Sequence, residues 1–272
     1  MSDTKFPLRS PADRAFPWRS LRIIVLSFVL LLTGLSAWLT RVRTASWQRP
    51  LWVAIYPINA DGSVASTSYI DALDTSAFAP IDAFFAREAR HHSISLLRPV
   101  ETHLYARVAL LPPALALDAG RLGTMLWSIR LRYWALRVTR GREEARPDVQ
   151  IFVLYQDPEL TPSVPHSVGL QKGMLGVVYA FAARRATSPN NIVITHELMH
   201  TLGATDKYDP VTDAPRFPEG YAEPDRRPLL PQPHAEIMAG RIMTSATSWE
   251  MPESLDSVVM GRLSAAEIHW VH

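Results

Sequence analysis

Residues 190–206 read NNIVITHELMHTLGATD, and this stretch governs how the rest of the chain is interpreted. Ser188 is placed to cap a helix whose first residue is Pro189, because proline lacks the amide hydrogen that a first helical turn leaves unpaired. The helix is expected to end at Gly203, since glycine readily adopts the left-handed conformation that terminates helices. The sequence therefore predicts one continuous helix that carries both histidines of the stretch.

His196 and His200 are four residues apart, so their imidazoles stand on one face of that helix and can bind a single tetrahedral metal ion. Glu197 is rotated by about 100° from His196, which leaves its carboxylate free to take a proton from a water at the metal. Gly203 lets the chain turn sharply, so that Asp206 can return as a third ligand. The fourth position then stays open for water, as catalysis requires.

The third ligand has rivals among the residues that follow Asp206. They are Asp209, Glu219, Glu223, His234 and Glu236. The alternative to a metal site is a helix whose histidines pack in an ordinary core, because a HExxH pentapeptide also arises by chance. The predicted helix, with its cap and its stop, favours the metal site.

The composition excludes several classes of protein. The chain has 272 residues, of which 47% are hydrophobic and 20% charged, so general disorder is excluded. It holds no cysteine, which excludes disulfides, thiolate metal sites and cysteine nucleophiles. Residues 1–40 carry five basic and two acidic residues, whereas the remainder carries 23 basic and 24 acidic residues. The bulk of the chain therefore has no basic excess, and a nucleic-acid partner is not expected.

An uncharged, mostly apolar run occupies residues 23–40. Its eighteen residues would span roughly 27 Å as a helix, close to the thickness of a bilayer core. Trp18, Trp38 and Trp47 lie near its two ends, where an interfacial aromatic belt would sit. The run predicts an uncleaved transmembrane signal anchor, and a cleaved signal peptide and a buried core helix are the alternatives.

The anchor divides the chain into regions with expected locations. Residues 1–22 are expected to form a cytoplasmic tail, because more basic residues precede the span than follow it. Residues 41–50 are expected to be a linker, and residues 51–272 the functional domain. The chain is thus predicted to be a single-pass protein of the cytoplasmic (inner) membrane, with its functional domain extracytoplasmic, in the periplasm.

Strands and helices alternate in the rest of the chain, which predicts an α/β fold. Apolar runs predict strands at Leu51–Ile58, Val100–Leu111, Val149–Tyr155 and Gly173–Ala183. Residues 67–90 predict helix, with Pro80 dividing the stretch or starting a second helix. The expected core face comprises Ile70, Leu73, Phe78, Ile81, Phe84 and Phe85.

Two further segments stand out. Leu122–Val138 predicts an amphipathic helix with solvated arginines and four apolar residues on one side, namely Leu126, Ile129, Tyr133 and Leu136. Residues 209–233 include seven prolines, so they are expected to form an extended loop rather than regular structure. A loop of this length in a compact domain is usually functional or mobile.

The string HELMHTLGATD resembles the HExxHxxGxx(H/D) signature of the metzincin clan of zinc metallopeptidases, in the snapalysin-type variant with aspartate as third ligand. The longer string HELMHTLGATDKYDP, followed by GYAEP and AEIMAGRIM, is similar to membrane-anchored bacterial proteins with a predicted metallopeptidase domain. The resemblance covers about 60 residues, 190–250. It implies an α+β zincin-like domain with a mixed sheet packed on helices, an upper part at 51–203 and a smaller lower part at 204–272.

The resemblance also implies roles for single residues. Four positions match the zinc ligands and the general base, namely His196, His200, Asp206 and Glu197. Met238 resembles the Met-turn beneath the ligand histidines, with Met243 as a weaker candidate and ordinary core packing as the alternative. Tyr208 or Tyr221 could donate a hydrogen bond to the oxyanion.

Residues 173–181 resemble the edge strand to which an extended substrate binds by β-augmentation. The expected substrate-binding residues are Gly176, Val177, Val178 and Tyr179. Together these features predict a membrane-anchored endopeptidase that uses Zn²⁺ and Glu197 to hydrolyse peptide or protein substrates. The alternatives are a non-catalytic binding protein with a zincin fold and a domain whose metal site is purely structural, with four protein ligands and no open position.

Overall fold

The computed structural model divides the chain into two compact units, Met1–Leu39 and Thr40–His272. The structure describes residues 21–28, 31, 47–114, 120–141, 147–163, 165, 167–171 and 174–271. In the first unit, residues 21–28 and Leu31 are helical. Among the described residues, no helix has both the length and the apolar character needed to cross a membrane. Most of the expected span at 23–40, together with Trp18 and Trp38, lies outside the described residues.

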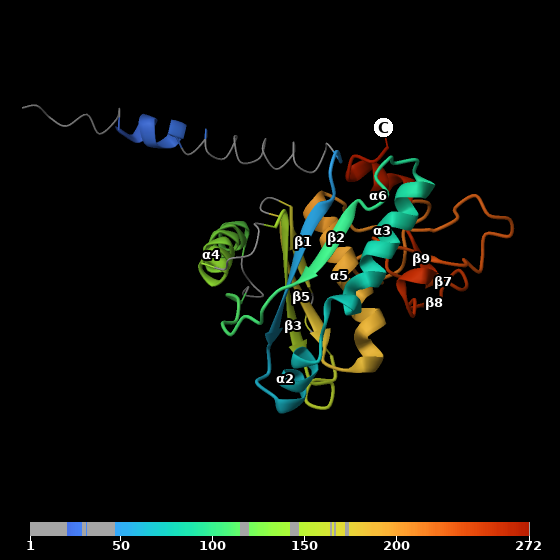
Figure 1. Cartoon of the computed structure of the whole chain (residues 1–272). Helices are drawn as coiled ribbons and strands as arrows, with labels where there is room; N and C mark the ends of the chain where they lie inside the picture. The colour runs from blue at the N-terminus through green and yellow to red at the C-terminus, as the bar shows by residue number, and fades with distance from the viewer. Residues whose placement is uncertain are drawn as a thin grey trace, which may run out of the picture. The chain divides into compact units, whose positions relative to one another are not determined.

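The second unit is built on a five-stranded mixed sheet with the order β2-β1-β3-β5-β4 (Figure 1). The strands are β1 (Leu51–Asn59), β2 (Val100–Leu104), β3 (Val149–Gln156), β4 (Val168–Leu170) and β5 (Leu175–Phe181). Strands β1, β2, β3 and β5 are parallel, and the short edge strand β4 runs antiparallel to β5. The α/β class expected from the sequence is therefore confirmed.

Helices cover both faces of this sheet. They are α2 (Val64–Asp71), α3 (Ala79–His91), α4 (Arg121–Thr139), α5 (Thr187–Leu202) and α6 (Arg262–Glu267), with short 3₁₀ turns at Thr75–Phe78, Arg184–Ala186 and Leu255–Ser257. Helices α3 and α5 lie on one face, and α4 lies alone on the other (Figure 1). Strands β1, β3 and β5 therefore bury side chains on both of their faces, as central parallel strands do.

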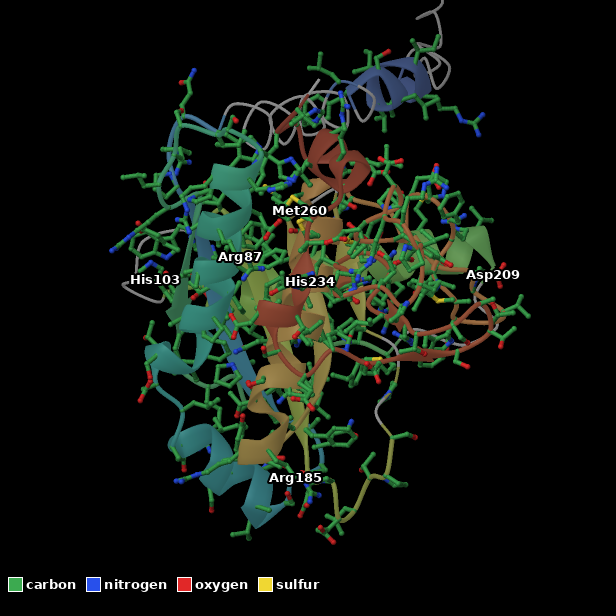
Figure 2. The ribbon with its side chains drawn as sticks, turned by 90° about the vertical axis from the view of Figure 1, so that its right-hand side faces the viewer. Arg87, His103, Arg185, Asp209, His234 and Met260 are labelled. Carbon is green, nitrogen blue, oxygen red and sulfur yellow. The ribbon has the colours of Figure 1, made fainter. Side chains whose placement is uncertain are left out.

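The C-terminal part after α5 is held by small β-pairs rather than by a large sheet. Strand β6 (Ala235–Glu236) pairs with β9 (Val258–Val259), and β7 (Ile242–Met243) pairs with β8 (Trp249–Glu250). Residues 209–233 contain no helix or regular strand, which confirms the expected loop. Figure 2 shows Asp209 at the side of the molecule, whereas His234 and Met260 lie closer to Arg87 of α3.

Local sequence signals placed most elements to within a few residues. Pro80 lies in the first turn of α3, and the predicted core face of α2 and α3 is buried, with Leu73 packed at its margin. The second predicted strand was too long, because β2 ends at Leu104. Helix α5 begins at Thr187 without a side-chain cap, so the cap expected from Ser188 was wrong, although the helix does end at Gly203.

Helix α4 occupies the predicted segment, but the apolar side predicted from the sequence does not face the sheet. Trp127, Leu131 and Ala135 pack on the sheet, whereas Ile129 and Leu136 are among the residues that remain exposed. The helix carries apolar residues on two opposite sides, and periodicity alone could not tell which one would meet the sheet. The bulkier indole of Trp127 also donates a hydrogen bond to the Pro113 carbonyl, which favours the observed side.

Trp47, expected near the membrane interface, packs within the folded domain. Its indole nitrogen donates a hydrogen bond of 2.7 Å to the Ile268 carbonyl, and its ring packs edge-on against Trp270. Arg49 follows with an ion pair to Asp148. The expected linker at 41–50 therefore ends before Trp47, and residues 41–46 lie outside the described residues.

Strand β5 is not the edge strand that the resemblance implied. It pairs with β3 over its whole length, and β4 covers its other side from Leu175 to Val177. Gly176, Val177 and Val178 are buried, and the Tyr179 amide donates to the Ser167 hydroxyl. The edge belongs instead to β4, which was too short to be recognised as a strand in the sequence. Gly173, the expected start of the strand, lies outside the described residues.

Candidate metal centre

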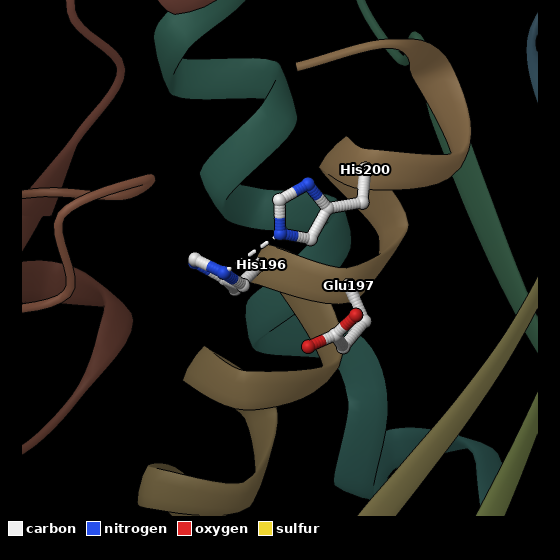
Figure 3. Close-up of side chains that lie close together, drawn as sticks. All are labelled: His196, Glu197 and His200. Atoms are coloured by element: carbon white, nitrogen blue, oxygen red, sulfur yellow. Dashed lines mark hydrogen bonds between the residues drawn. The ribbon is translucent and has the colours of Figure 1, made fainter. Parts of the chain in front are cut away.

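Helix α5 presents His196, Glu197 and His200 at the end of the sheet that carries β4 (Figure 3). The three side chains offer ligand atoms that all lie within 4.8 Å of one another. The two imidazoles turn toward each other, with their Nε2 atoms 3.0 Å apart, and Glu197 lies beside them. This cluster on a helix is compatible with a HExxH zinc site.

Backbone carbonyls fix the protonation of both rings. His196 Nδ1 lies 2.9 Å from the Ile237 carbonyl oxygen, and His200 Nδ1 lies 2.8 Å from the Ala204 carbonyl oxygen. A carbonyl can only accept a hydrogen bond, so each Nδ1 must carry the proton. In a neutral imidazole the Nε2 atom is then a bare lone pair, which is the form that binds metal. Both Nε2 atoms point at the same small space.

Asp206 supplies a third acceptor to that space. Its Oδ1 atom lies 3.1 Å from each of the two Nε2 atoms, and this buried oxygen has no other partner among the described residues. Three lone pairs at this distance repel one another unless a proton or a metal cation lies among them. Tetrahedral zinc ligands bound at about 2.0–2.1 Å lie about 3.3 Å apart. The triangle of His196, His200 and Asp206 therefore fits a zinc ion.

The charge state of Asp206 suits a ligand. Burial opposes its ionisation, but the two imidazoles beside it hold the pKa of its carboxyl well below the usual range. The carboxylate is therefore ionised at neutral pH, as metal binding requires. Burial by itself would lower the pKa of His200, yet Asp206 and Glu197 raise it above its ordinary value. In the metal-free protein, His200 therefore keeps its second proton to a higher pH than a free imidazole would.

Glu197 is buried beside the pair, with only 5% of its surface exposed. Burial raises the pKa of its carboxyl, while the neighbouring histidines and the Gly169 amide oppose that rise. Its Oε2 atom is buried and has no hydrogen-bond partner within the described residues. A carboxylate with a raised pKa and an unused oxygen next to a metal site is suited to accept and return a proton.

The turn after α5 brings Asp206 back to the histidines. Gly203 has a φ of 114°, a conformation that favours glycine, and its amide donates to the carbonyls of Met199 and His200. Further along, the buried Lys207 ammonium contacts both carboxylate oxygens of Glu267 at 2.8–2.9 Å. Glu267 also accepts hydrogen bonds from the amide and the hydroxyl of Thr205. The segment on both sides of Asp206 is therefore clamped to α6.

Met238, the residue expected to form a Met-turn, lies in a turn close to the histidines in the fold. It is fully buried, and the preceding residue, Ile237, provides the carbonyl that orients His196. The turn is held by Glu236, whose carboxylate accepts from the amides of Met238, Ala239 and Gly261 and from the Ser264 hydroxyl; the Ser264 bond is 2.7 Å. Met243 lies in β7 instead. The turn therefore orients a candidate metal-binding histidine through its backbone.

The rival ligands are engaged elsewhere. Asp209 accepts hydrogen bonds from the amides of Val211 and Thr212 in its own turn, and the four donors on Glu236 occupy both of its oxygens. Glu219, Glu223 and His234 line a separate hollow of about 920 Å³ between α3 and α6. Asp206 is therefore the one candidate that the structure places against both histidines.

The two candidate tyrosines lie in different places. The ring of Tyr208 is 6.5 Å from the ring of His196, between centroids, and burial and the charge of Asp206 raise the pKa of its hydroxyl. The hydroxyl of Tyr208 thus stays protonated and can donate a hydrogen bond near the site. Tyr221 packs edge-on against Phe217 and lines the separate hollow.

Gly169 is a site residue that the sequence did not reveal. It lies in β4, where a Cβ atom would stand 2.5 Å from the Glu197 carbonyl oxygen and 2.6 Å from the His200 Cβ. Only glycine therefore lets the edge strand approach α5 this closely. The signal in the sequence was a lone glycine in a short segment, and its partner is a helix almost thirty residues later.

We expect Gly169→Ala to displace α5 from β4 and to weaken zinc binding by roughly ten- to a hundredfold, the range found when groups that orient ligands are lost. Overpacking should also lower the free energy of unfolding by about 1–3 kcal/mol. Gly120→Ala is the matched control, because a Cβ at Gly120 meets no atom within 4 Å. Zinc titration and thermal unfolding of both variants would check this, and equal zinc affinities would refute the role of Gly169.

No family model and no curated protein matches this chain. The assignment of the site therefore depends on its own geometry and chemistry. That geometry is compatible with a HExxH-type metal site in which the Asp206 carboxylate lies against both histidines.

Proposed function

We propose that the chain is a zinc-dependent endopeptidase. One observation carries this proposal: three acceptor atoms, from His196, His200 and Asp206, converge at 3.0–3.1 Å with both Nδ1 protons already used. A buried carboxylate with an unused oxygen, Glu197, stands next to them. A site that only held the fold together would gain nothing from leaving that oxygen without a partner.

Zinc at these three residues would act as a Lewis acid that polarises a peptide carbonyl and lowers the pKa of a water toward 7. Glu197 takes a proton from the attacking water on its free Oε2 and then delivers it to the leaving amine. The raised pKa of Glu197 suits both steps, because it brings proton uptake and release closer to neutral pH. The Tyr208 hydroxyl is proposed to donate a hydrogen bond to the oxyanion, because its ring lies 6.5 Å from that of His196.

The substrate is proposed to bind along β4 rather than β5. Strand β4 is the edge of the sheet, and Gly169 at its centre touches the backbone of Glu197. An extended peptide that adds a strand to this edge would pass directly beside the two histidines. The preferred substrate is therefore a peptide or an extended protein segment.

The first test is to purify the full chain in detergent, count bound zinc, and screen unstructured proteins and peptide mixtures for cleavage with and without a chelator. We expect one zinc per chain and cleavage that stops on chelation and returns on addition of zinc. Zinc without cleavage would favour a binding protein or a structural site. X-ray absorption would separate these last two, since a structural site has four protein ligands.

We further propose that the apolar segment at 23–40 anchors the enzyme in the cytoplasmic membrane, with the domain from Trp47 onward outside the cytoplasm. The support is the length of the segment and the basic residues that precede it. An anchored enzyme would act on substrates near the membrane. Protease protection of spheroplasts would test the location of the domain, and a protected domain would contradict it.

Zinc affinity should fall as the pH falls. The pKa of His200 is raised in the metal-free protein, so below that pKa zinc must displace a proton from His200 Nε2. The affinity should then decrease about tenfold for each pH unit and each proton displaced. Asp206 adds no dependence near neutrality, because its pKa lies far below that range. Titrations against a competing chelator between about pH 5 and pH 8 would measure this, and a flat profile would contradict it.

A further inference from the structure

Helix α4 exposes a continuous apolar stripe on the side that faces away from the sheet. Its members are Leu122, Met125, Leu126, Ile129, Tyr133 and Leu136, each more than half exposed. Tyr133 and Leu136 reach 70% and 71% exposure. Single exposed apolar residues are ordinary on protein surfaces. A row of them along one helix instead marks a surface that contacts a protein partner or a membrane.

The stripe lies directly opposite the packed side of the helix. At 100° per residue, Leu122, Ile129 and Leu136 fall within about 40° of one another. Trp127, Leu131 and Ala135, which bury against the sheet, point about 180° away from them. The exposed residues of the stripe therefore do not contribute to the packing of α4 on the sheet.

Arginines flank the stripe, and the helix contains no acidic residue. By the same helical geometry, Arg130 and Arg137 border one edge of the stripe and Arg132 borders the other. None of the three forms an ion pair with a described residue. This pattern, an apolar face with cationic side chains at both of its edges, is typical of helices that lie in the surface of an anionic membrane.

We propose that the outer face of α4 docks on the surface of a bilayer that contains anionic lipids. The apolar stripe enters the boundary between headgroups and acyl chains, and the arginines reach the phosphates. A second copy of the chain is a poorer occupant, because two such helices would bring their arginines together. Helix α5 lies on the other face of the sheet, so docking through α4 leaves the metal centre open (Figure 1).

The lack of cysteine makes a direct test possible. Ile129→Cys and Val64→Cys, each in the full chain, receive one nitroxide label; Val64 is 82% exposed on α2 and serves as the control. Both are reconstituted into vesicles of phosphatidylcholine alone or mixed with phosphatidylglycerol. The rate at which each label collides with a water-soluble nickel complex is then measured. The ratio of the two rates does not depend on the direction in which the protein is inserted, because both labels lie on the same side of the membrane.

We expect the label at position 129, but not the one at position 64, to be protected in the mixed vesicles. Arg130→Gln with Arg137→Gln should lower the ratio of docked to undocked helix roughly thirtyfold, since each arginine near an anionic surface contributes about 1 kcal/mol. Arg184→Gln with Arg185→Gln makes the same change of charge on another exposed turn and should have no effect. Equal accessibility of both labels, protection that is the same in neutral vesicles, or protection that grows with protein concentration without vesicles would each overturn the proposal.

Discussion

Replacing Glu197 with glutamine should leave zinc bound and reduce peptide cleavage by about a hundred- to ten-thousandfold, the contribution typical of a general acid–base group. Glutamine has the same shape and fills the same buried position, but it cannot accept and return a proton. Because the structure gives the metal three other acceptors, in His196, His200 and Asp206, zinc affinity should change little. The measurements are zinc content, thermal unfolding and kcat/KM of the full chain.

Glu223→Gln provides the matched control for this experiment. Glu223 is a partly exposed carboxylate in the long loop, paired with Arg226, and it lines the separate hollow. Its substitution should change neither zinc content nor cleavage. Full activity in Glu197→Gln would remove Glu197 from the base role. A loss of zinc in Glu197→Gln would show instead that Glu197 is a fourth ligand, as a structural site requires.

The sequence was sufficient for the larger strands and helices of the sheet domain because their signals are local. Apolar runs marked β1, β3 and β5, and a glycine with the required left-handed conformation marked the end of α5. Strand β4 escaped prediction because three residues are too few to show alternation. The buried side of α4 was mispredicted for another reason. The helix has two apolar sides, and packing, not the periodicity of the sequence, decides which of them meets the sheet.

The candidate site was predictable where its members are close in sequence. The spacing of His196 and His200 fixes them on one helix face, and Gly203 makes the return of Asp206 possible. The groups that orient these ligands lie far away in the chain, and no spacing rule connects them. The Ile237 carbonyl, the Glu267 carboxylate and Gly169 of β4 reach the site only through the tertiary fold.

Glu236 illustrates how burial changes the meaning of a residue. In the sequence it is a carboxylate near a metal motif and therefore a rival ligand. In the structure, burial raises the pKa of its carboxyl, but four donors satisfy its oxygens and stabilise it in place. It holds the turn whose Ile237 carbonyl fixes the His196 tautomer. A polar residue that is conspicuous in the sequence thus supports the site without touching the metal.

Asp206→Ala should weaken zinc binding by more than about a hundredfold, beyond the range expected for groups that only orient ligands. The substitution leaves two imidazoles and removes the one anionic ligand, whose Oδ1 atom lies 3.1 Å from both. It also removes the charge that helps to keep His200 protonated in the metal-free protein, so the pKa of His200 should fall. Zinc titration against a competing chelator and NMR titration of the histidines would measure the two effects.

Asp209→Ala is the control. Asp209 is an aspartate three residues away whose carboxylate accepts hydrogen bonds from its own turn, and it lies at the side of the molecule (Figure 2). It should bind zinc as tightly as the unaltered chain. Asp206→His offers a rescue, since imidazole is also a good zinc ligand, and should recover part of the lost affinity. If Asp206→Ala bound zinc normally, the third ligand would have to come from elsewhere, and the convergence of the three lone pairs would need another explanation, such as a proton shared between Asp206 and His200.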